Sequence, residues 1–180
     1  MGKILDPNYF FSRERAYLLL GYAESEFLKA EAALRGWAGM ELTGTAEEYY
    51  KSGIKASMEY YGIANDKAQA YIDGLKTLTT DKVFEGGDKE KQLEAIITQK
   101  WMAIFPNGNE GWAEFRRTDY PALANQLINN SGGDVPMGKN IKRILYPLSE
   151  NSNSYFTSHP ELLQVNTQGN RLWWDVADTN

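Results

Sequence analysis

The chain has 180 residues, of which 42% are hydrophobic and 24% are charged, and it carries a net charge of −5. This length and composition are ordinary for one globular domain with its own core, whereas the acidic balance argues against nucleic acid as a partner, because phosphate binding draws on a surplus of Lys and Arg. The absence of cysteine excludes thiol nucleophiles, thiolate metal sites and disulfides, and the absence of an apolar run of about 18 residues predicts no transmembrane helix.

The first predicted element is a helix from about Ser12 to Arg35. Its apolar residues recur at intervals of three and four, which places them on one helical stripe. Ser12 is a suitable N-cap, and Gly36 supplies a stop. The stripe expected to face the core consists of Leu20, Ala23, Phe27, Ala30 and Leu34.

A capping box opens the second predicted helix, with Thr45 as the cap and Glu48 three residues later. The helix is expected to continue to about Tyr61, where Gly62 ends it. Because the connection between the two helices is short, they are expected to pack as an antiparallel hairpin. The stripe on the second helix consists of Ala46, Tyr50, Ile54, Ser57 and Tyr61.

A third, shorter helix is predicted from Asp66 to Lys76, with Asn65 as its cap, and residues 75–81 are expected to form a loop. The fourth predicted helix starts after Gly86 and Gly87, with Asp88 as its cap. It carries an apolar stripe and ends at the segment Phe105-Pro-Asn-Gly108. The stripe consists of Leu93, Ile96, Ile97, Trp101 and Ile104.

These four helices predict a mainly α fold, with tetratricopeptide-like helical hairpins over residues 12–105, although the strict repeat consensus is absent. Residues 106–180 are expected to be mostly coil with short helices. Within them, 125–134 and 151–154 are predicted loops, and 141–146 is a short extended segment ended by Pro147. Coil of this length is usually functional or held by a larger body.

Two adjacent arginines, Arg116 and Arg117, follow the Pro-Asn-Gly stop. A guanidinium forks onto carboxylates and stacks on aromatic rings. We interpret the pair as part of an ion-pair network that pins the coil to the helices, in preference to direct ligand contact. The candidate acidic partners are Asp119, Glu24, Glu31 and Glu150.

Several catalytic alternatives receive little support from the residue pattern. The single histidine, His159, lies in a predicted polar loop, and a serine triad would require it as the base. One histidine with scattered carboxylates does not form a metal site. Glu110 and Glu114 near Trp112 are two carboxylates of the kind that a glycosidase needs, but pairing with the arginines or exposure on a helix face explains them better.

Four ordered motifs resemble the C-terminal part of SusD/RagB-type proteins, which are cell-surface glycan-binding lipoproteins of Gram-negative bacteria. In chain order the motifs are Tyr22-Ala-Glu-Ser-Glu-Phe-Leu-Lys-Ala-Glu-Ala32 with Arg35-Gly36; Gln99-Lys-Trp101 and Phe105-Pro-Asn-Gly108 with Trp112 and Phe115-Arg-Arg-Thr118; Arg143-Ile-Leu-Tyr-Pro147 with Glu150; and Trp173-Trp-Asp175. Together they cover nearly the whole chain.

The resemblance implies that residues 1–180 are the C-terminal part of a SusD-like domain. Family members are roughly two to three times this length, are mostly helical, and begin with a signal peptide and a lipidated cysteine. The resemblance therefore implies an outer-membrane lipoprotein on the extracellular face, attached by an N-terminal lipid anchor absent from this chain.

The resemblance also implies a non-catalytic function, namely capture of oligosaccharide and its delivery to a SusC-type TonB-dependent transporter. We expect no enzymatic activity and no cofactor. The residues that we single out as candidate ligand contacts combine aromatic faces with guanidinium groups. They are Trp112, Arg116, Arg117, Tyr146, Trp173 and Trp174.

Two rival functions remain open. A tetratricopeptide-type scaffold would bind a partner protein through a helical groove and would be indifferent to sugars. A glycosidase would release reducing ends and would lose that activity when Glu110 or Glu114 is replaced by Gln.

Overall fold

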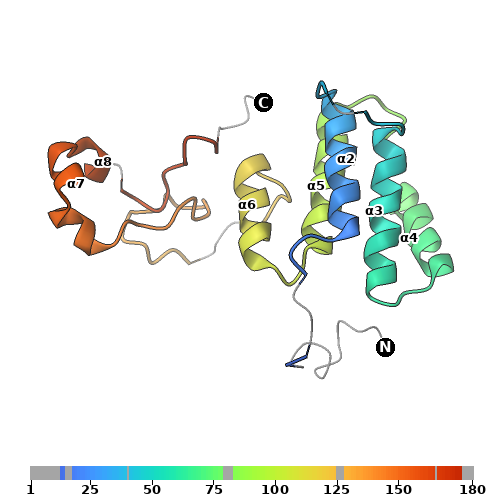
Figure 1. The fold of residues 1–180 in the computed structure, drawn as a ribbon, viewed down its shortest axis with the longest axis horizontal. Coiled ribbons are helices and arrows are strands. Elements are labelled where there is room, and N and C mark those ends of the chain that lie inside the picture. Colours follow the sequence, from blue (N-terminus) through green and yellow to red (C-terminus); the bar gives the residue numbers. More distant parts are fainter. Residues whose placement is uncertain are drawn as a thin grey trace. The chain divides into compact units, whose positions relative to one another are not determined.

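The structure is a computed structural model that describes residues 13–14, 18–39, 41–78, 83–124, 128–164 and 166–175. The chain divides into two compact units, residues 1–112 and 113–180. The regular elements that Figure 1 shows among the described residues are helices, and no strand is found there. The expected mainly α fold is therefore confirmed. Over the same residues, no helix has the length and hydropathy that crossing a bilayer requires.

Unit 1 is built from four helices, α2 (Tyr22–Arg35), α3 (Ala46–Tyr60), α4 (Asn65–Leu78) and α5 (Lys89–Ala103). Helix α2 packs against both α3 and α5, and α3 also contacts α4, as Figure 1 shows. The apolar stripes of the helices meet in one core, because a helix must bury its apolar face against a neighbour. The buried residues of this core are Phe27, Ala30, Tyr50, Ile54, Ile72 and Ile96.

The caps of three helices follow the sequence. Thr45 and Glu48 form both hydrogen bonds of the capping box at the start of α3. The Asp88 carboxylate accepts from the backbone N–H groups of the first turn of α5. Gly36 ends α2 in the left-handed conformation, with a φ of 66°, which glycine adopts without steric cost. These three predictions are confirmed.

The predicted continuous helix over residues 12–35 is wrong in its N-terminal part. Helix α2 begins at Tyr22, Gly21 is extended, and Leu20 is 60% exposed instead of facing the core. Glycine in a helix interior costs about 1 kcal/mol relative to alanine, so a helix that begins after Gly21 avoids this cost. The proposed cap Ser12 lies outside the described residues.

Helix α4 is longer than predicted. Residues 75–78, expected to begin a loop, are helical, whereas 79–81 lie outside the described residues. Leu75 packs against the core of unit 1, so tertiary packing extends the helix beyond its local sequence preference. The cap assigned to Asn65 is also wrong, because Asn65 is already helical and the carbonyl of Ala64 accepts from the N–H of Ala68.

Two glycines in helices of unit 1 are expected to respond in opposite ways to replacement by alanine. A Cβ at Gly53 would lie 2.8 Å from the ring of Phe27, whereas a Cβ at Gly74 would meet nothing within 4 Å. Gly53→Ala should cost about 1–3 kcal/mol through overpacking, more than the roughly 1 kcal/mol gained in helix propensity. Gly74→Ala should gain about 0.5–1 kcal/mol. Urea denaturation of both variants measures the two signs, and a stabilised Gly53→Ala would contradict the close packing.

Unit 2 begins within α6 (Gly108–Thr118) and continues as coil interrupted by η2 (Leu148–Ser152), α7 (Ser154–Ser158) and α8 (Glu161–Gln164). Residues 141–147 have no regular secondary structure, and the backbone N–H groups of Lys142 and Arg143 donate to the carbonyl of Gln168. The predicted loop at 151–154 is largely helical, because the side chain of Asn153 caps the start of α7.

Candidate functional site

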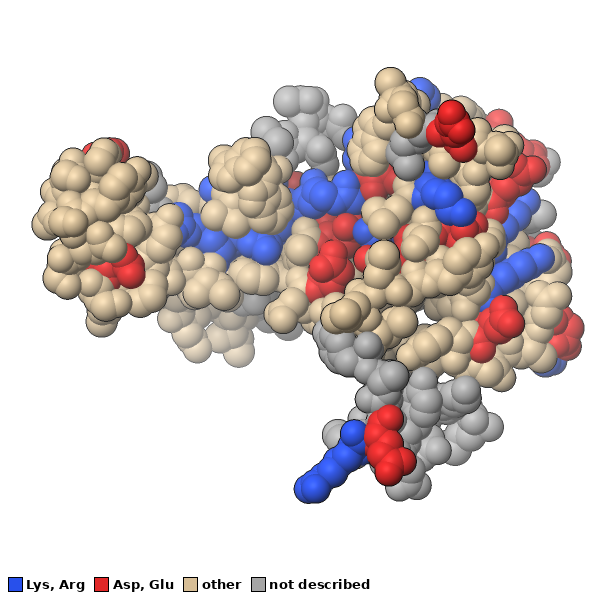
Figure 2. Space-filling view, viewed as in Figure 1, with Lys and Arg blue, Asp and Glu red and all other residues tan. Residues whose placement is uncertain are grey.

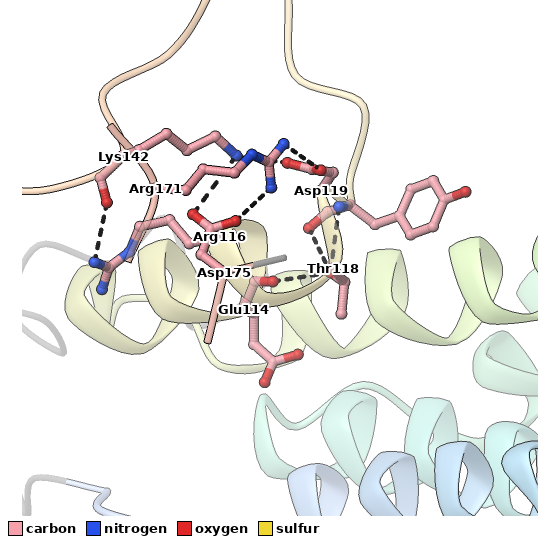
Figure 3. Close-up of polar contacts among 8 residues, drawn as sticks. Glu114, Arg116, Thr118, Asp119, Lys142, Arg171 and Asp175 are labelled. Atoms are coloured by element: carbon pink, nitrogen blue, oxygen red, sulfur yellow. Dashed lines mark hydrogen bonds and ion pairs between the residues drawn. The ribbon is translucent and has the colours of Figure 1, made fainter. Parts of the chain in front are cut away.

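The C-terminal turn of α6 sets the geometry of the candidate site. The Thr118 hydroxyl donates to the carbonyl of Glu114 at 2.8 Å and accepts from the N–H of Tyr120 at 3.2 Å. Asp119 follows with a φ of 57°, in the left-handed region that aspartate tolerates better than most residues. The helix therefore stops at Thr118, and the Asp119 carboxylate meets two cations from the coil (Figure 3).

Those cations come from distant parts of the chain. Lys142 Nζ lies 2.5 Å from Asp119 Oδ1, and Arg171 donates to Asp119 Oδ2 at 2.7 Å. Arg171 also donates to Asp175, whose side chain is fully buried. Figure 3 shows the four side chains converging beside the end of α6. We call Asp119, Lys142, Arg171 and Asp175 the carboxylate–cation network.

Asp175 occupies the innermost position of this network. Its Oδ2 atom lies 4.0 Å from Lys142 Nζ, beyond hydrogen-bond length, and no group of the described residues donates to it. A buried carboxylate without its cations would be strongly penalised. Arg171 and Lys142 therefore hold Asp175 in place, and with it the end of the segment 171–175.

The network lowers the pKa of Asp119. Burial by itself raises this pKa, but hydrogen bonds from Lys142 and Arg171, together with their charges, lower it below the ordinary value of 3.8. For Arg171, burial is the largest single influence and lowers the pKa, but the hydrogen bonds and charges of Asp119 and Asp175 together raise this pKa above its ordinary value. Asp119 thus remains ionised through the whole neutral and mildly acidic range.

This pKa shift predicts acid sensitivity of unit 2. Because the folded pKa of Asp119 lies below its unfolded value, its contribution to stability is fully present above about pH 4 and is lost as the pH falls through the folded pKa. Asp119→Asn should keep the left-handed backbone while lowering stability at pH 7 and weakening the loss of stability below pH 4. Thermal melts at pH 7, 5 and 3, followed by the NMR signal of the Trp174 indole, measure both effects. An unchanged acid response in the variant would contradict the assignment.

The arginine pair has partners within its own unit. Arg117 donates to Glu114 at 2.9 Å, and Glu114 is buried. Arg116 donates to the carbonyl of Lys142 at 3.2 Å and lies 4.9 Å from the centre of the Trp174 ring. Arg116 therefore joins the end of α6 to the coil, whereas Arg117 pairs within α6. The ion pairs to Asp119 come from Lys142 and Arg171, which the sequence pattern does not mark.

The aromatic candidates differ in exposure. The N–H of Asp175 donates to the carbonyl of Leu172, which places Trp173 and Trp174 at the tip of a turn. Trp174 is half-buried beneath Arg116, whereas Trp173 is 91% exposed. Tyr146 is 38% exposed, and Trp112 is half-buried in unit 1. Every candidate except Trp112 thus lies in unit 2, where Arg116 contacts Trp174.

The residues considered for catalysis are placed as follows. His159 lies at the end of α7, 3.0 Å from the Ser158 hydroxyl and stacked on Tyr155, and none of the described carboxylates bonds to it. Glu114 is committed to Arg117. The described residues also contain no group of three or more metal-binding side chains.

Comparison with known proteins places these features in a family. The family model for SusD-like proteins, described as SusD and RagB outer-membrane lipoproteins, matches residues 4–175. No curated protein sequence matches the chain. A chitin-binding SusD homologue from Flavobacterium johnsoniae is 36% identical over 86% of the chain and 36% of its own length, with a TM-score of 0.68.

Two further solved structures agree. A SusD homologue from Bacteroides thetaiotaomicron is 32% identical over 85% of the chain and 37% of its own length, with a TM-score of 0.71. One from Bacteroides ovatus is 34% identical over 86% and 37%, with a TM-score of 0.66. The chain thus spans a little over a third of the length of these relatives.

Proposed function

This chain belongs to the SusD/RagB family of outer-membrane lipoproteins, and we propose that it contributes to non-catalytic capture of oligosaccharide at the cell surface. The observation that carries the proposal is the 36% identity, over 86% of the chain, to a chitin-binding relative. In this proposal the captured glycan passes to a SusC-type TonB-dependent transporter, and a lipid anchor holds the protein at the extracellular face of the outer membrane.

The exposed aromatics of unit 2 support a glycan contact. A sugar ring packs its C–H groups on an aromatic face, while nearby polar side chains hydrogen-bond its hydroxyls. Trp173 is exposed enough to offer such a face, whereas the 38% exposed ring of Tyr146 also contacts Arg143 and Phe156. Arg116, Arg117 and Trp174 contact their own chain and would support the site more than touch the ligand. Trp112 stays a candidate from sequence alone.

Calorimetric titration with chitotetraose and a panel of other neutral and acidic oligosaccharides tests this function. We expect binding without release of reducing ends, and we expect Trp173→Ala to weaken it at least tenfold, about 1.4 kcal/mol. Trp37→Ala is the matched control, because Trp37 is an exposed tryptophan of unit 1.

Three results would overturn the proposal. Failure of the whole panel to bind would remove glycan capture, and release of reducing ends would indicate a hydrolase. Binding of a peptide or protein with indifference to sugars would favour the scaffold function.

A further inference from the structure

Arg143 differs from three other cations of unit 2. Arg143 is a buried residue, with 7% of its surface exposed. Arg117, Lys142 and Arg171 each meet a carboxylate. Across the described residues no carboxylate lies within ion-pair distance of Arg143. A largely buried guanidinium normally has a counter-charge, which the described residues do not supply to Arg143.

The contacts that Arg143 does make are weak for a charged group. One N–H donates to Asn166 Oδ1 at 3.2 Å, and Nε donates to the carbonyl of Ile144 at 3.4 Å. The guanidinium also lies 4.5 Å from the centre of the Tyr146 ring. A guanidinium has five N–H donors in a rigid fork, so most of its hydrogen-bonding capacity is unused.

Asn166 fixes this arrangement and adds a second donor. Its Oδ1 atom accepts from both Arg143 and the backbone N–H of Tyr146, at 3.2 and 3.0 Å. The same carboxamide has an NH₂ group that donates to none of the described residues. Arg143 and Asn166 therefore combine a positive charge with free donors beside a half-exposed aromatic ring. Figure 2 shows basic side chains gathered along the coil of unit 2 between α7 and α6.

We propose that Arg143, Asn166 and Tyr146 form a recognition site for the carboxylate of an acidic sugar. The site rests on the proposed glycan-binding function and narrows it to uronate-type glycans. The carboxylate would accept a forked pair of hydrogen bonds from the guanidinium, and the sugar ring would lie against the exposed part of Tyr146. A sugar ligand suits this set better than a simple anion, because the aromatic ring offers nothing to an ion alone.

Titration of the full chain with trigalacturonate and with its fully methyl-esterified form tests the site, because the two differ in charge and share their rings. We expect the acid to bind at least tenfold more tightly than the ester. Arg143→Met should abolish this preference. Lys139→Met should retain it, because Lys139 is an exposed residue of the same unit and its loss changes the net charge equally.

Asn166→Asp is a second variant, which tests the site even if the chain does not fold with Arg143→Met. It places a carboxylate within reach of the guanidinium and keeps the acceptor for Tyr146. We expect it to raise the melting temperature by about 2–4 °C and to eliminate acid binding, because the ligand's counter-charge is already supplied.

The outcomes separate this inference from the proposed function. Equal affinities for acid and ester, or a preference that survives Asn166→Asp, would overturn the carboxylate site. Binding of chitotetraose alone, without either galacturonate ligand, would overturn the site and leave glycan capture intact. Failure of every oligosaccharide to bind would overturn both.

Discussion

Replacing Phe27 by alanine is expected to lower the free energy of unfolding of unit 1 by about 3–5 kcal/mol. Phe27 is 1% exposed, its ring meets Tyr50 edge-on at 6.3 Å, and it fills the space above Gly53. Truncation would leave a cavity between α2 and α3 that these helices cannot close. Since a whole domain is typically stable by only 5–15 kcal/mol, urea denaturation followed by helical circular dichroism should show a large shift of the midpoint.

Two comparisons isolate the ring as the cause. Leu28→Ala, at the next position of α2, should cost about 1 kcal/mol or less, because Leu28 is 38% exposed. Gly53→Ala, destabilising in the parent chain, should become neutral or stabilising in the Phe27→Ala background, because the clashing ring is gone. An equal cost of Gly53→Ala in both backgrounds would contradict the packing that the structure shows.

The helical core was predictable because its signals are local. The spacing of Phe27 and Ala30 on one helix, and of Tyr50 and Ile54 on the next, fixes which faces are apolar whatever the rest of the fold does. The caps at Thr45 and Asp88 were predictable for the same reason, since each side chain bonds to backbone two or three residues away.

The misplaced helix ends have a different origin. The apolar periodicity through Leu20 favours a longer helix, whereas the low helix propensity of Gly21 favours a later start. In the structure the propensity of Gly21 prevails, and α2 begins after it. The extension of α4 through Leu75 depends on contact with other helices, and a single-sequence pattern does not contain that contact.

The site was only half predictable. The motif containing Arg116 and Arg117 drew attention to the end of α6, and the closing motif drew attention to Trp173 and Trp174. Lys142 and Arg171 were missed because they lie 23 and 52 residues from Asp119 in the sequence. No periodicity marks such a contact. The only signal in the sequence was that Lys142 and Arg171 lie beside the motifs Arg143-Ile-Leu-Tyr-Pro147 and Trp173-Trp-Asp175.

Asp175 carries the second large prediction. Its side chain is fully buried, and it shares Arg171 with Asp119 at the centre of the carboxylate–cation network. In Asp175→Ala, Lys142 and Arg171 would have only the Asp119 carboxylate left as a counter-charge in the network. Breaking a buried pair costs about 3–5 kcal/mol, and the partial exposure of Arg171 reduces this, so we expect a loss of about 2–3 kcal/mol. Hydrogen–deuterium exchange of peptides from residues 113–175 should detect the loss locally.

The carboxylate–cation network predicts that the stability lost when a carboxylate is removed depends on how buried that carboxylate is and not on the number of its ion pairs. Glu47→Ala breaks the exposed Glu47–Lys51 pair, whose charged groups lie 2.6 Å apart, and should cost about 0.5 kcal/mol or less. Asp175→Asn keeps the shape of the side chain and an acceptor for Arg171. Its loss of stability should therefore lie between those of Asp175→Ala and Glu47→Ala. If Asp175→Ala cost as little stability as Glu47→Ala, the carboxylate–cation network would not fix the turn that exposes Trp173. The coil of unit 2 would then be held by its backbone contacts and by the Arg116–Trp174 stack.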